Sequence, residues 1–347
     1  MEKKPTGGLP VVSVIIPMRN EEKYIGGCLE SVISQDYPKE LIEVMVVDGA
    51  SCDGSLEIVR EFMEEHSNIK LLGGPGVNCP AAMNIGIREA AGDIIAKVDA
   101  HGYVASDFLR MSVKYLSGDG EIRCVGGPIT PVVDTNVAKA NAIARSSVFG
   151  VGKGVYSAGE KAQFVETVQC GVYKKGVFGV VGLFDESLQF GEDEEINWRI
   201  IISGCKILLT PEVRFFYFPR NSFRKLFRQY FNYGAARVKV VQKHPHFFNV
   251  KHVIPTAFFL ALFGTGTLSL FSNLFGGLFL GIVLLYVIVS LGFSAVIGAK
   301  EGWKCICLLP VSFAALHLGY GMGFCCGIMG YLAVISKAGH KEPKVKN

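Results

Sequence analysis

The chain has 347 residues, of which 50% are hydrophobic, and its mean hydropathy is +0.34. This composition is too apolar for a wholly soluble enzyme, and the formal net charge of +4 is modest. The apolar excess is concentrated late in the chain, because residues 253–299 contain no Asp, Glu, Lys or Arg. We therefore expect a polar domain followed by a membrane region.

Residues 1–10 contain two lysines but no apolar run before a cleavage site, so they do not resemble a secretory signal peptide. We expect the N-terminal domain to stay in the cytosol. The ten cysteines fit a reducing compartment, since they lack the paired spacing of a zinc site. We interpret them as free, mostly buried residues.

The first part of the chain alternates between predicted strands and helices. Residues 11–17 form a β-branched apolar run typical of a strand buried on both faces, and a helix capped by Asn20 should follow. A second strand over residues 42–47 precedes a helix over residues 56–62. This alternation predicts a parallel sheet with crossover helices.

The alternation continues with a strand at residues 69–72, a helix at 81–90 and a strand at 94–98. Residues 118–190 are rich in glycine and predict only short strands and loops, whereas the acids of residues 191–195 favour a new helix. Ligands of open parallel sheets bind beyond the carboxyl ends of the strands. Four side chains lie at such ends and are candidates for one shared site: Asp48, Asp53, Asp99 and His101.

Residues 222–239 predict an amphipathic helix. One helical face is apolar and another carries Arg224, Lys225 and Arg228. Nine Lys or Arg residues and no acid lie within residues 214–251, just before the first long apolar run. This pattern favours a helix in the interface of an anionic membrane over a nucleic-acid partner. The alternative is a helix packed on the polar domain with a solvated basic face.

Three apolar segments follow. Residues 253–271 and 274–297 are each long enough to cross a hydrocarbon core of about 30 Å, and a third crossing is expected near residues 314–335. Three crossings would place the lysines of residues 300–304 on the opposite side from those of residues 337–346. That placement conflicts with the tendency of basic residues to stay inside. A re-entrant third segment would resolve the conflict.

Three pairs of polar residues could carry chemistry. Asp48 and Asp53 could hydrogen-bond the base and ribose of a nucleotide, although Asp-Gly sequences also simply make turns. Asp99 and His101 place two metal-competent side chains on one side of an extended segment, which could bridge Mg²⁺ or Mn²⁺ to a diphosphate. Glu192 and Asp193 could supply a general base, or could be acids that favour a helix start.

The order and spacing of these residues resemble glycosyltransferase family 2 over roughly residues 11–240. The resemblance rests on residues 11–17 followed by Arg19-Asn20-Glu21, on residues 48–55, on Asn84-Ile85-Gly86 with Ala91-Gly92-Asp93 and Asp99-Ala100-His101, on Phe184-Asp185-Glu186, and on Gly191-Glu192-Asp193. The membrane region further resembles that of succinoglycan-type exopolysaccharide glucosyltransferases. Five ordered motifs make the resemblance more specific than any one of them.

The resemblance implies a GT-A fold, an α/β fold with a Rossmann-like, mostly parallel sheet, followed here by a C-terminal transmembrane helical region. It also implies an inverting single displacement, with Asp193 as the catalytic base and a divalent cation, Mn²⁺ or Mg²⁺, held by Asp99 and His101. The nucleotide-binding residues would be Pro17, Asn20, Glu21, Asp48, Asp53 and Asp99. The acceptor and membrane interface would consist of Glu192, Arg224, Arg228, Gln229 and Tyr230.

Two features depart from the family pattern. His101 stands where the family's Asp-x-Asp motif has its second acid, which lowers the negative charge of the site. The Gln-x-x-Arg-Trp motif of processive members is absent, and residues 229–233 occupy a comparable place without the Arg-Trp pair. We therefore expect one sugar to be added per encounter.

These features predict an integral protein of the cell membrane with a cytosolic catalytic domain at residues 1–220, an interfacial helix at 221–250 and about three membrane segments in 251–347. We expect transfer of a hexose, from UDP-glucose or a similar nucleotide sugar, to a lipid-linked saccharide in polysaccharide or glycoconjugate synthesis. Membrane lipids are further expected partners, and nucleic acid is not. Two alternatives stay open. One is transfer to polyprenyl or dolichyl phosphate, and the other is a non-catalytic membrane scaffold, which Asp193 disfavours because a binding module needs no base.

Overall fold

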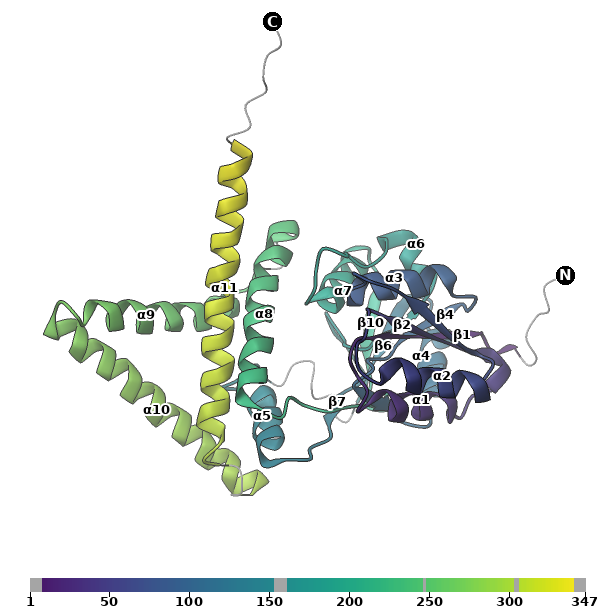
Figure 1. The fold of residues 1–347 in the computed structure, drawn as a ribbon, viewed down its shortest axis with the longest axis horizontal. Helices are drawn as coiled ribbons and strands as arrows, with labels where there is room; N and C mark the ends of the chain where they lie inside the picture. The colour runs from purple at the N-terminus through teal and green to yellow at the C-terminus, as the bar shows by residue number, and fades with distance from the viewer. Residues whose placement is uncertain (1–7, 153–160, 246–247, 303–305, 340–347) are drawn as a thin grey trace, which may run out of the picture. The chain divides into compact units, whose positions relative to one another are not determined.

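The computed structural model describes residues 8–152, 161–245, 248–302 and 306–339. The chain divides into two compact units (Figure 1). The α/β unit comprises Met1–Val132 and Gly154–Phe218, and the helical unit comprises Val133–Lys153 and Pro219–Asn347. The predicted catalytic domain, residues 1–220, is therefore interrupted by a short segment that folds with the C-terminal helices.

The α/β unit is built on a large mixed sheet. Its first four strands run parallel, as the strand and helix alternation predicts, because each connection crosses over through a helix. The other four strands have two to five residues, and β9 runs antiparallel between β4 and β6. The order across the sheet is β3 (Ile69–Gly73), β2 (Ile42–Asp48), β1 (Val12–Met18), β4 (Ile94–Lys97), β9 (Val172–Lys174), β6 (Ile122–Gly126), β10 (Lys206–Leu209) and β8 (Gln163–Phe164).

Helices cover both faces of this sheet (Figure 1). Alternate residues of β1 explain why: Val14 and Ile16 point into one apolar core, and Ile15 points into the other. The first core is closed by α1 (Ile25–Ile33), α2 (Ser55–Glu65) and α4 (Phe108–Gly118). The second is closed by α3 (Cys79–Glu89), α6 (Val177–Val181) and α7 (Glu192–Ile202).

A smaller sheet joins segments from the middle and the end of the α/β unit. Its strands, in order, are β5 (Gly102–Val104), β11 (Phe215–Tyr217) and β7 (Ile129–Pro131). A short 3-10 turn, η2 (Lys39–Leu41), precedes β2. Because β5 follows β4 after only a few residues, the segment that carries Asp99 and His101 is fixed at both of its ends.

The predicted strands and helices of residues 11–98 are confirmed, with ends shifted by a few residues. The expected helix cap at Asn20 is wrong. Tyr24 stands at the N-cap of α1, and Asn20 has a positive φ of 56° in the preceding loop. The region expected to hold only short strands and loops contains the helix α5 (Asn136–Ser146), whose N-cap Thr135 accepts a hydrogen bond from the Ala138 N–H.

The helical unit contains α5 and the C-terminal helices. These are α8 (Phe223–Lys243), the 3-10 turn η4 (Val250–His252), α9 (Ile254–Leu268), α10 (Asn273–Glu301) and α11 (Leu309–Gly339). A buried polar contact fastens α5 to α11, because the Ser312 hydroxyl donates to Asn141 Oδ1 at 2.8 Å. Asn141 in turn donates to the Arg220 carbonyl at 2.7 Å, just before α8.

The apolar face of α8 is covered by protein. Leu226 and Tyr230 are buried, and α8 lies along α11 (Figure 1). Gly234 and Gly323 permit this approach, since a Cβ at either position would overlap the backbone of the facing helix. The apolar face of α8 therefore packs on α11, and the basic residues Arg224 and Arg228 are exposed as predicted. The location of α8 in the membrane interface stays a prediction.

Two helices are long and apolar enough to cross a membrane, by length and composition: Asn273–Lys300 within α10 and Leu309–Ala333 within α11. They differ in burial, because 6% of an apolar 18-residue stretch is buried in α10 against 44% of the corresponding stretch in α11. The helix at the first predicted crossing, α9, has 15 residues. Three crossings therefore stay a prediction, and Lys304, Lys341, Lys344 and Lys346 lie outside the described residues.

Candidate active site at the carboxyl edge of the sheet

Two loops at the carboxyl ends of β1 and β2 are held together by hydrogen bonds. The Asn20 side chain accepts from the Cys52 N–H at 2.8 Å, and the Asn20 N–H donates to the Ser51 hydroxyl at 2.9 Å. The Glu22 carboxylate accepts from the Gly54 N–H at 3.2 Å. Pro17 lies in β1 beside Val47 of β2, directly before these loops. The loops therefore form one rigid rim.

Asp48 and Asp53 both shape this rim. Asp48 is buried and accepts hydrogen bonds from the N–H groups of Ala50 and Ser51 and from the Ser51 hydroxyl. Asp53 accepts from the Ser55 N–H at 3.1 Å and from the Glu22 N–H at 3.2 Å. Burial raises the pKa of the Asp53 carboxyl, but its hydrogen bonds together outweigh burial and hold the pKa below its usual value.

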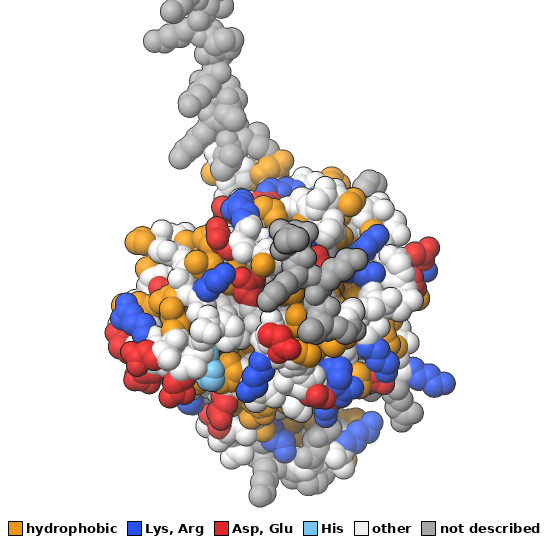
Figure 2. Space-filling model, turned by 90° about the vertical axis from the view of Figure 1, so that its right-hand side faces the viewer, with side chains coloured by type: hydrophobic (Ala, Val, Ile, Leu, Met, Phe, Trp, Pro, Cys, Tyr) orange, Lys and Arg blue, Asp and Glu red, His pale blue; other side chains and the backbone are white. Residues whose placement is uncertain are grey.

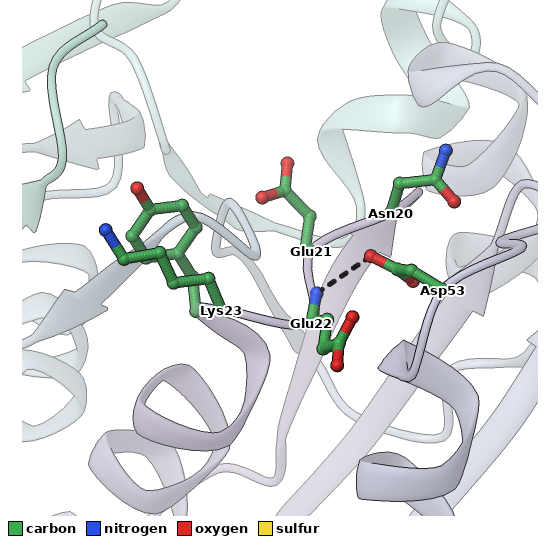
Figure 3. A pocket seen from close by; sticks show the side chains of 6 residues that line it. Asn20, Glu21, Glu22, Lys23 and Asp53 are labelled. Carbon is green, nitrogen blue, oxygen red and sulfur yellow. Dashed lines mark hydrogen bonds between the residues drawn. The ribbon is translucent and has the colours of Figure 1, made fainter. Parts of the chain in front are cut away.

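A pocket opens on this rim (Figure 3). In the close-up, the Glu21 carboxylate points away from Asp53, and the Lys23 ammonium lies on the other side of the pocket from Asp53. The lining residues are Asn20, Glu21, Glu22, Lys23, Tyr24 and Asp53. Three of the predicted nucleotide-binding residues, Asn20, Glu21 and Asp53, thus line one pocket.

Asp99 and His101 follow β4 at the same edge of the sheet. His101 Nδ1 lies 3.7 Å from Glu21 Oε1, so the segment after β4 meets the loop after β1. The Cys28 thiol of α1 contacts the Asp99 carbonyl at 3.8 Å, which anchors the backbone below the carboxylate. The loop that carries Glu21 therefore lies close to the segment that carries Asp99 and His101, two of the four residues that the strand-end argument assigns to one site.

Glu192 and Asp193 begin α7 on the far side of this edge. Gly191 precedes them with φ 79°, a left-handed conformation that glycine adopts without strain and that starts the helix sharply. Both carboxylates turn toward Lys97 of β4, whose Nζ lies 2.7 Å from Asp193 Oδ1 and 3.0 Å from Glu192 Oε1. The same Nζ lies 3.9 Å from Asp99 Oδ1.

The loop before α7 is held by α3. The side chain of Asn84, which is 2% exposed, donates to the Phe184 carbonyl and accepts from the Phe184 N–H, each at 2.9 Å. Asn84 also donates to Glu186 Oε1 at 2.8 Å, and Asn78 donates to the Glu186 carbonyl at 2.8 Å. These contacts fix the segment that leads into Asp193.

Comparison with known proteins identifies the family. The family model described as glycosyl transferase family 2 matches residues 13–168. A protein of Methanococcus voltae is 33% identical over 258 residues, which cover 72% of this chain and 79% of that protein. The chain belongs to glycosyltransferase family 2. The Methanococcus protein is named dolichyl N-acetyl-alpha-D-glucosaminyl phosphate 3-beta-D-2,3-diacetamido-2,3-dideoxy-beta-D-glucuronosyltransferase.

Two further proteins resemble this family 2 glycosyltransferase over most of its length. The succinoglycan biosynthesis protein ExoA of Rhizobium meliloti is 28% identical over 313 residues, covering 90% of this chain and 93% of its own. The mannosyltransferase PcManGT of Pyrobaculum calidifontis, solved with GDP-Man and Mn²⁺, superposes with a TM-score of 0.57 at 19% identity. That superposition covers 90% of this chain and 87% of the other, and it shows the shared GT-A fold.

The metal ligands that this glycosyltransferase offers fit a divalent cation whose coordination shell is completed by substrate oxygens. Asp99 and His101 offer one carboxylate and one imidazole on the same short segment. No group of three or more His, Cys, Asp or Glu side chains that could hold a metal occurs among the described residues. Mg²⁺ and its relatives commonly bind one or two protein ligands and take the rest from phosphates and water. The residues present therefore fit a cation held jointly with a diphosphate.

Asp193 is buried, and its ionisation reflects two opposing effects. Burial raises the pKa of its carboxyl, and the neighbouring Lys97 ammonium lowers it, with the result that the pKa lies at about 7. A carboxyl with such a pKa can accept a proton near neutral pH. This property suits the role of a base that the family resemblance implies.

Sequence reasoning missed Lys97. A signal was present, because a lysine ends the apolar strand Ile94–Lys97. A charged side chain on a strand that is buried on both faces needs charged partners. The sequence could not say which acids those partners were, since Glu192 and Asp193 lie almost a hundred residues further along.

The predicted acceptor and membrane interface is divided between the two units. Glu192 belongs to the α/β unit, whereas Arg224, Arg228, Gln229 and Tyr230 belong to α8 of the helical unit. Tyr230 is 5% exposed, and Gln229 donates to the Tyr233 hydroxyl at 3.1 Å. Arg224 and Arg228 are thus the members of this group whose side chains are open to a partner.

On the face of the α/β unit that Figure 2 shows, neither positive nor negative charge predominates. Acidic and basic side chains are interspersed across the part of this face that is drawn in colour, and hydrophobic groups lie between them in small separate areas. Surfaces of this kind are typical of a solvated face. The site residues therefore stand out by position and burial, not by a broad charged patch.

Proposed function

We propose that this glycosyltransferase moves a hexose from a nucleotide-diphosphate sugar, UDP-glucose or a similar donor, to a lipid-linked saccharide at the cytosolic face of the membrane. One sugar is added per encounter, with inversion at the anomeric carbon. The names of two relatives support the acceptor class, since one contains a dolichyl-linked sugar phosphate and the other refers to succinoglycan biosynthesis.

One observation carries this proposal. Asp99 and Asp193 lie in distant parts of the sequence, yet both approach the Lys97 ammonium, at 3.9 Å and 2.7 Å. A base for the acceptor hydroxyl and a group that faces the donor diphosphate must act around the same sugar. Their convergence at the carboxyl edge of the sheet is what such a reaction requires.

The chain's own residues then have distinct tasks. Asn20, Glu21 and Asp53 line the pocket that receives the nucleotide. Asp193 accepts the proton of the acceptor hydroxyl as that oxygen attacks the anomeric carbon and the bond from this carbon to the diphosphate breaks. A divalent cation at Asp99 and His101 would neutralise charge on the leaving diphosphate.

The experiment is sugar transfer by the full chain purified in detergent. Release of UDP is measured with a panel of UDP-sugars, with Mn²⁺, Mg²⁺ or EDTA, and with or without a membrane lipid extract. We expect release with one donor class, dependent on the extract. Asp193→Asn should lower kcat by on the order of 100-fold or more, whereas Glu194→Gln, one residue along α7, should stay close to wild type.

Two outcomes would contradict the proposal. The lipid product could carry a single sugar through a monophosphate, which mild acid hydrolysis would release. That result would show transfer to polyprenyl or dolichyl phosphate instead. Full activity of Asp193→Asn would remove Asp193 from the reaction. If no UDP-sugar supports release, GDP-sugars are tested next, and transfer from GDP-sugars alone would overturn the donor class.

A further inference from the structure

Lys97 is the most deeply buried charged side chain near the site. It is 1% exposed and lies at the end of β4, two residues before Asp99. Buried charges persist in folded proteins only when they are paired. Its partners come from both sides of the site, with Asp99 on its own segment and Glu192 and Asp193 on α7.

The geometry at α7 requires explanation. Consecutive residues of a helix project in different directions, and two adjacent carboxylates repel each other. Glu192 and Asp193 nevertheless both reach the Lys97 Nζ, at 3.0 Å and 2.7 Å. The Cys79 thiol of α3 also contacts Glu192 Oε1, at 3.5 Å, so Glu192 is held from a second direction.

We propose that Lys97 is a positioning residue for the catalytic base. Its ammonium holds Asp193 through Oδ1, and within the described part of the chain Oδ2 accepts no hydrogen bond and stays available for the acceptor hydroxyl. Glu192 is the second anchor of the ammonium. This inference rests on the proposed role of Asp193 as base.

The burial of Lys97 separates this role from direct catalysis. An ammonium that is 1% exposed does not touch a substrate in this conformation, so its effect must pass through the side chains it holds. A purely structural ion pair would contribute to stability alone. A positioning residue would change the rate of the chemical step while leaving donor binding intact.

The test compares three variants of the full chain in the UDP-release assay: Lys97→Met, Asp193→Asn and the double variant. Lys97→Met should lower kcat on the order of 100-fold while the KM for the donor stays within about threefold. In the Asp193→Asn background, Lys97→Met should lower kcat by less than about a further threefold, because the carboxylate that Lys97 holds is already replaced. The control is Lys174→Met on the neighbouring strand β9, whose Nζ donates to the Asp119 carbonyl, and it should keep its kcat.

Each outcome decides the matter. A kcat for Lys97→Met within about threefold of wild type, or a loss that multiplies in the Asp193→Asn background, overturns the positioning role. If Lys97→Met does not fold, Lys97→Arg is tested instead, because it keeps the charge. A kcat of at least about a tenth of wild type at unchanged donor KM supports the positioning role. A folded Lys97→Arg that is as inactive as Asp193→Asn overturns it. An active Asp193→Asn would instead mean that the proposed base is wrong, which is a separate result.

Discussion

Glu43 on β2 shows how one carboxylate can join several segments of the α/β unit. Its oxygens accept hydrogen bonds from the Ser13 hydroxyl at 2.7 Å, from the Lys70 ammonium at 2.8 Å and from the Ala91 N–H at 3.0 Å. Burial raises the pKa of the Glu43 carboxyl, but these hydrogen bonds together outweigh burial and leave the pKa below its usual value. Strands β1, β2 and β3 are thereby linked near their amino ends.

We predict that Glu43 contributes stability that is lost in acid. Because its pKa is lower in the folded than in the unfolded chain, the contribution is full above the unfolded value of about 4.3 and disappears as pH falls through the folded value. Glu43→Gln should destabilise the α/β unit at pH 7 by roughly 1–3 kcal/mol and should flatten its dependence on pH below about 5. Thermal unfolding in detergent, followed by the fluorescence of Trp198 in a Trp303→Phe background, measures both effects.

The matched control is Glu57→Gln. Glu57 pairs with Arg60 at 3.9 Å on the exposed face of α2, with both side chains more than half exposed. Exposed pairs of this kind contribute little, so this variant should unfold like wild type. Equal acid sensitivity of Glu43→Gln and wild type would show that Glu43 does not carry the effect.

His101 gives a second prediction at the scale of one residue. Replacing it in His101→Asp adds a carboxylate near Glu21, whose Oε1 lies 3.7 Å from the imidazole, and increases the negative charge beside Asp99. The metal concentration for half-maximal sugar transfer should fall by roughly tenfold, which corresponds to about 1.4 kcal/mol. Titration of Mg²⁺ and Mn²⁺ in the UDP-release assay measures this, with His66→Asp at the end of α2 as the control.

An unchanged or higher metal requirement for His101→Asp would mean that this side chain does not face the cation. In that case Asp99 would be the one predicted metal ligand left on this segment.

Single residues also mark the limit of sequence reasoning. The positions of Asp99, His101 and Asp193 at strand and helix ends could be predicted, because the alternation of elements brings such ends to one edge. The hydrogen bonds that the Asp48 carboxylate accepts within its own loop could not be predicted. They depend on the loop conformation, in which Ala50 takes a positive φ of 65° and the N–H groups of Ala50 and Ser51 donate to Asp48. The partners of Lys97 could not be predicted either, because Glu192 and Asp193 lie far away in the sequence.

At the scale of elements, the long periodic segments were predictable and the short ones were not. Strands β1, β2 and β4 are apolar runs that need no partner to be recognised. In contrast, β8 has two residues and β9 has three, so their pairing depends on the sheet that already exists beside them. The helix α5 is rich in alanine and closes against α11, a contact that a local pattern does not reveal.

The packing of α8 on α11 yields a prediction about glycine. A Cβ at Gly234 would overlap the Tyr320 carbonyl and lie 2.8 Å from the Phe324 backbone nitrogen. Gly234→Ala should therefore destabilise the helical unit by roughly 1–3 kcal/mol, although alanine is the better helix former. Thermal unfolding in detergent and the rate at which Cys325 and Cys326 of α11 react with maleimide measure the change.

Gly330→Ala is the matched control for this prediction. It makes the same substitution on α11 at an exposed position where nothing lies within 4 Å of the new Cβ. Helix propensity alone should make this variant slightly more stable. If Gly234→Ala behaved like Gly330→Ala, the two helices would not be in close contact at Gly234.

At the scale of the whole molecule, charge and burial bear on the membrane topology. Residues 213–300 contain no Asp or Glu, and the exposed basic residues of α8 include Arg224, Lys225 and Arg228. Charged side chains in the hydrocarbon core cost several kcal/mol each by order of magnitude, so we predict that α8 stays outside it. Because α11 packs along α8 through Gly319, Gly323 and Gly327, this stretch of α11 is not surrounded by lipid.

The helices α9 and α10 have the opposite character. Leu260, Phe263, Leu284 and Ile288 are among their many exposed apolar side chains, and a short turn at residues 269–272 connects the two helices. We predict that residues 253–271, which contain α9, and the helix α10 cross the membrane as a hairpin whose two outer ends lie on the side of α8. This topology resolves the conflict over the lysines, because the chain on both sides of α11 then stays on the basic side.

Labelling with a membrane-impermeant maleimide tests this topology in vesicles of known orientation. The exposed residues Cys52 and Cys307 should be labelled from the same side, and Ser272→Cys in the α9–α10 turn should be labelled from the opposite side, each as the single cysteine of the chain. If α10 crossed and α9 did not, Cys307 would move to the opposite side and Ser272→Cys would join Cys52. If α11 does not cross, an epitope at the end of the chain is also reached from the Cys52 side. Detection of that epitope from the opposite side would show that α11 spans the bilayer despite its contact with α8.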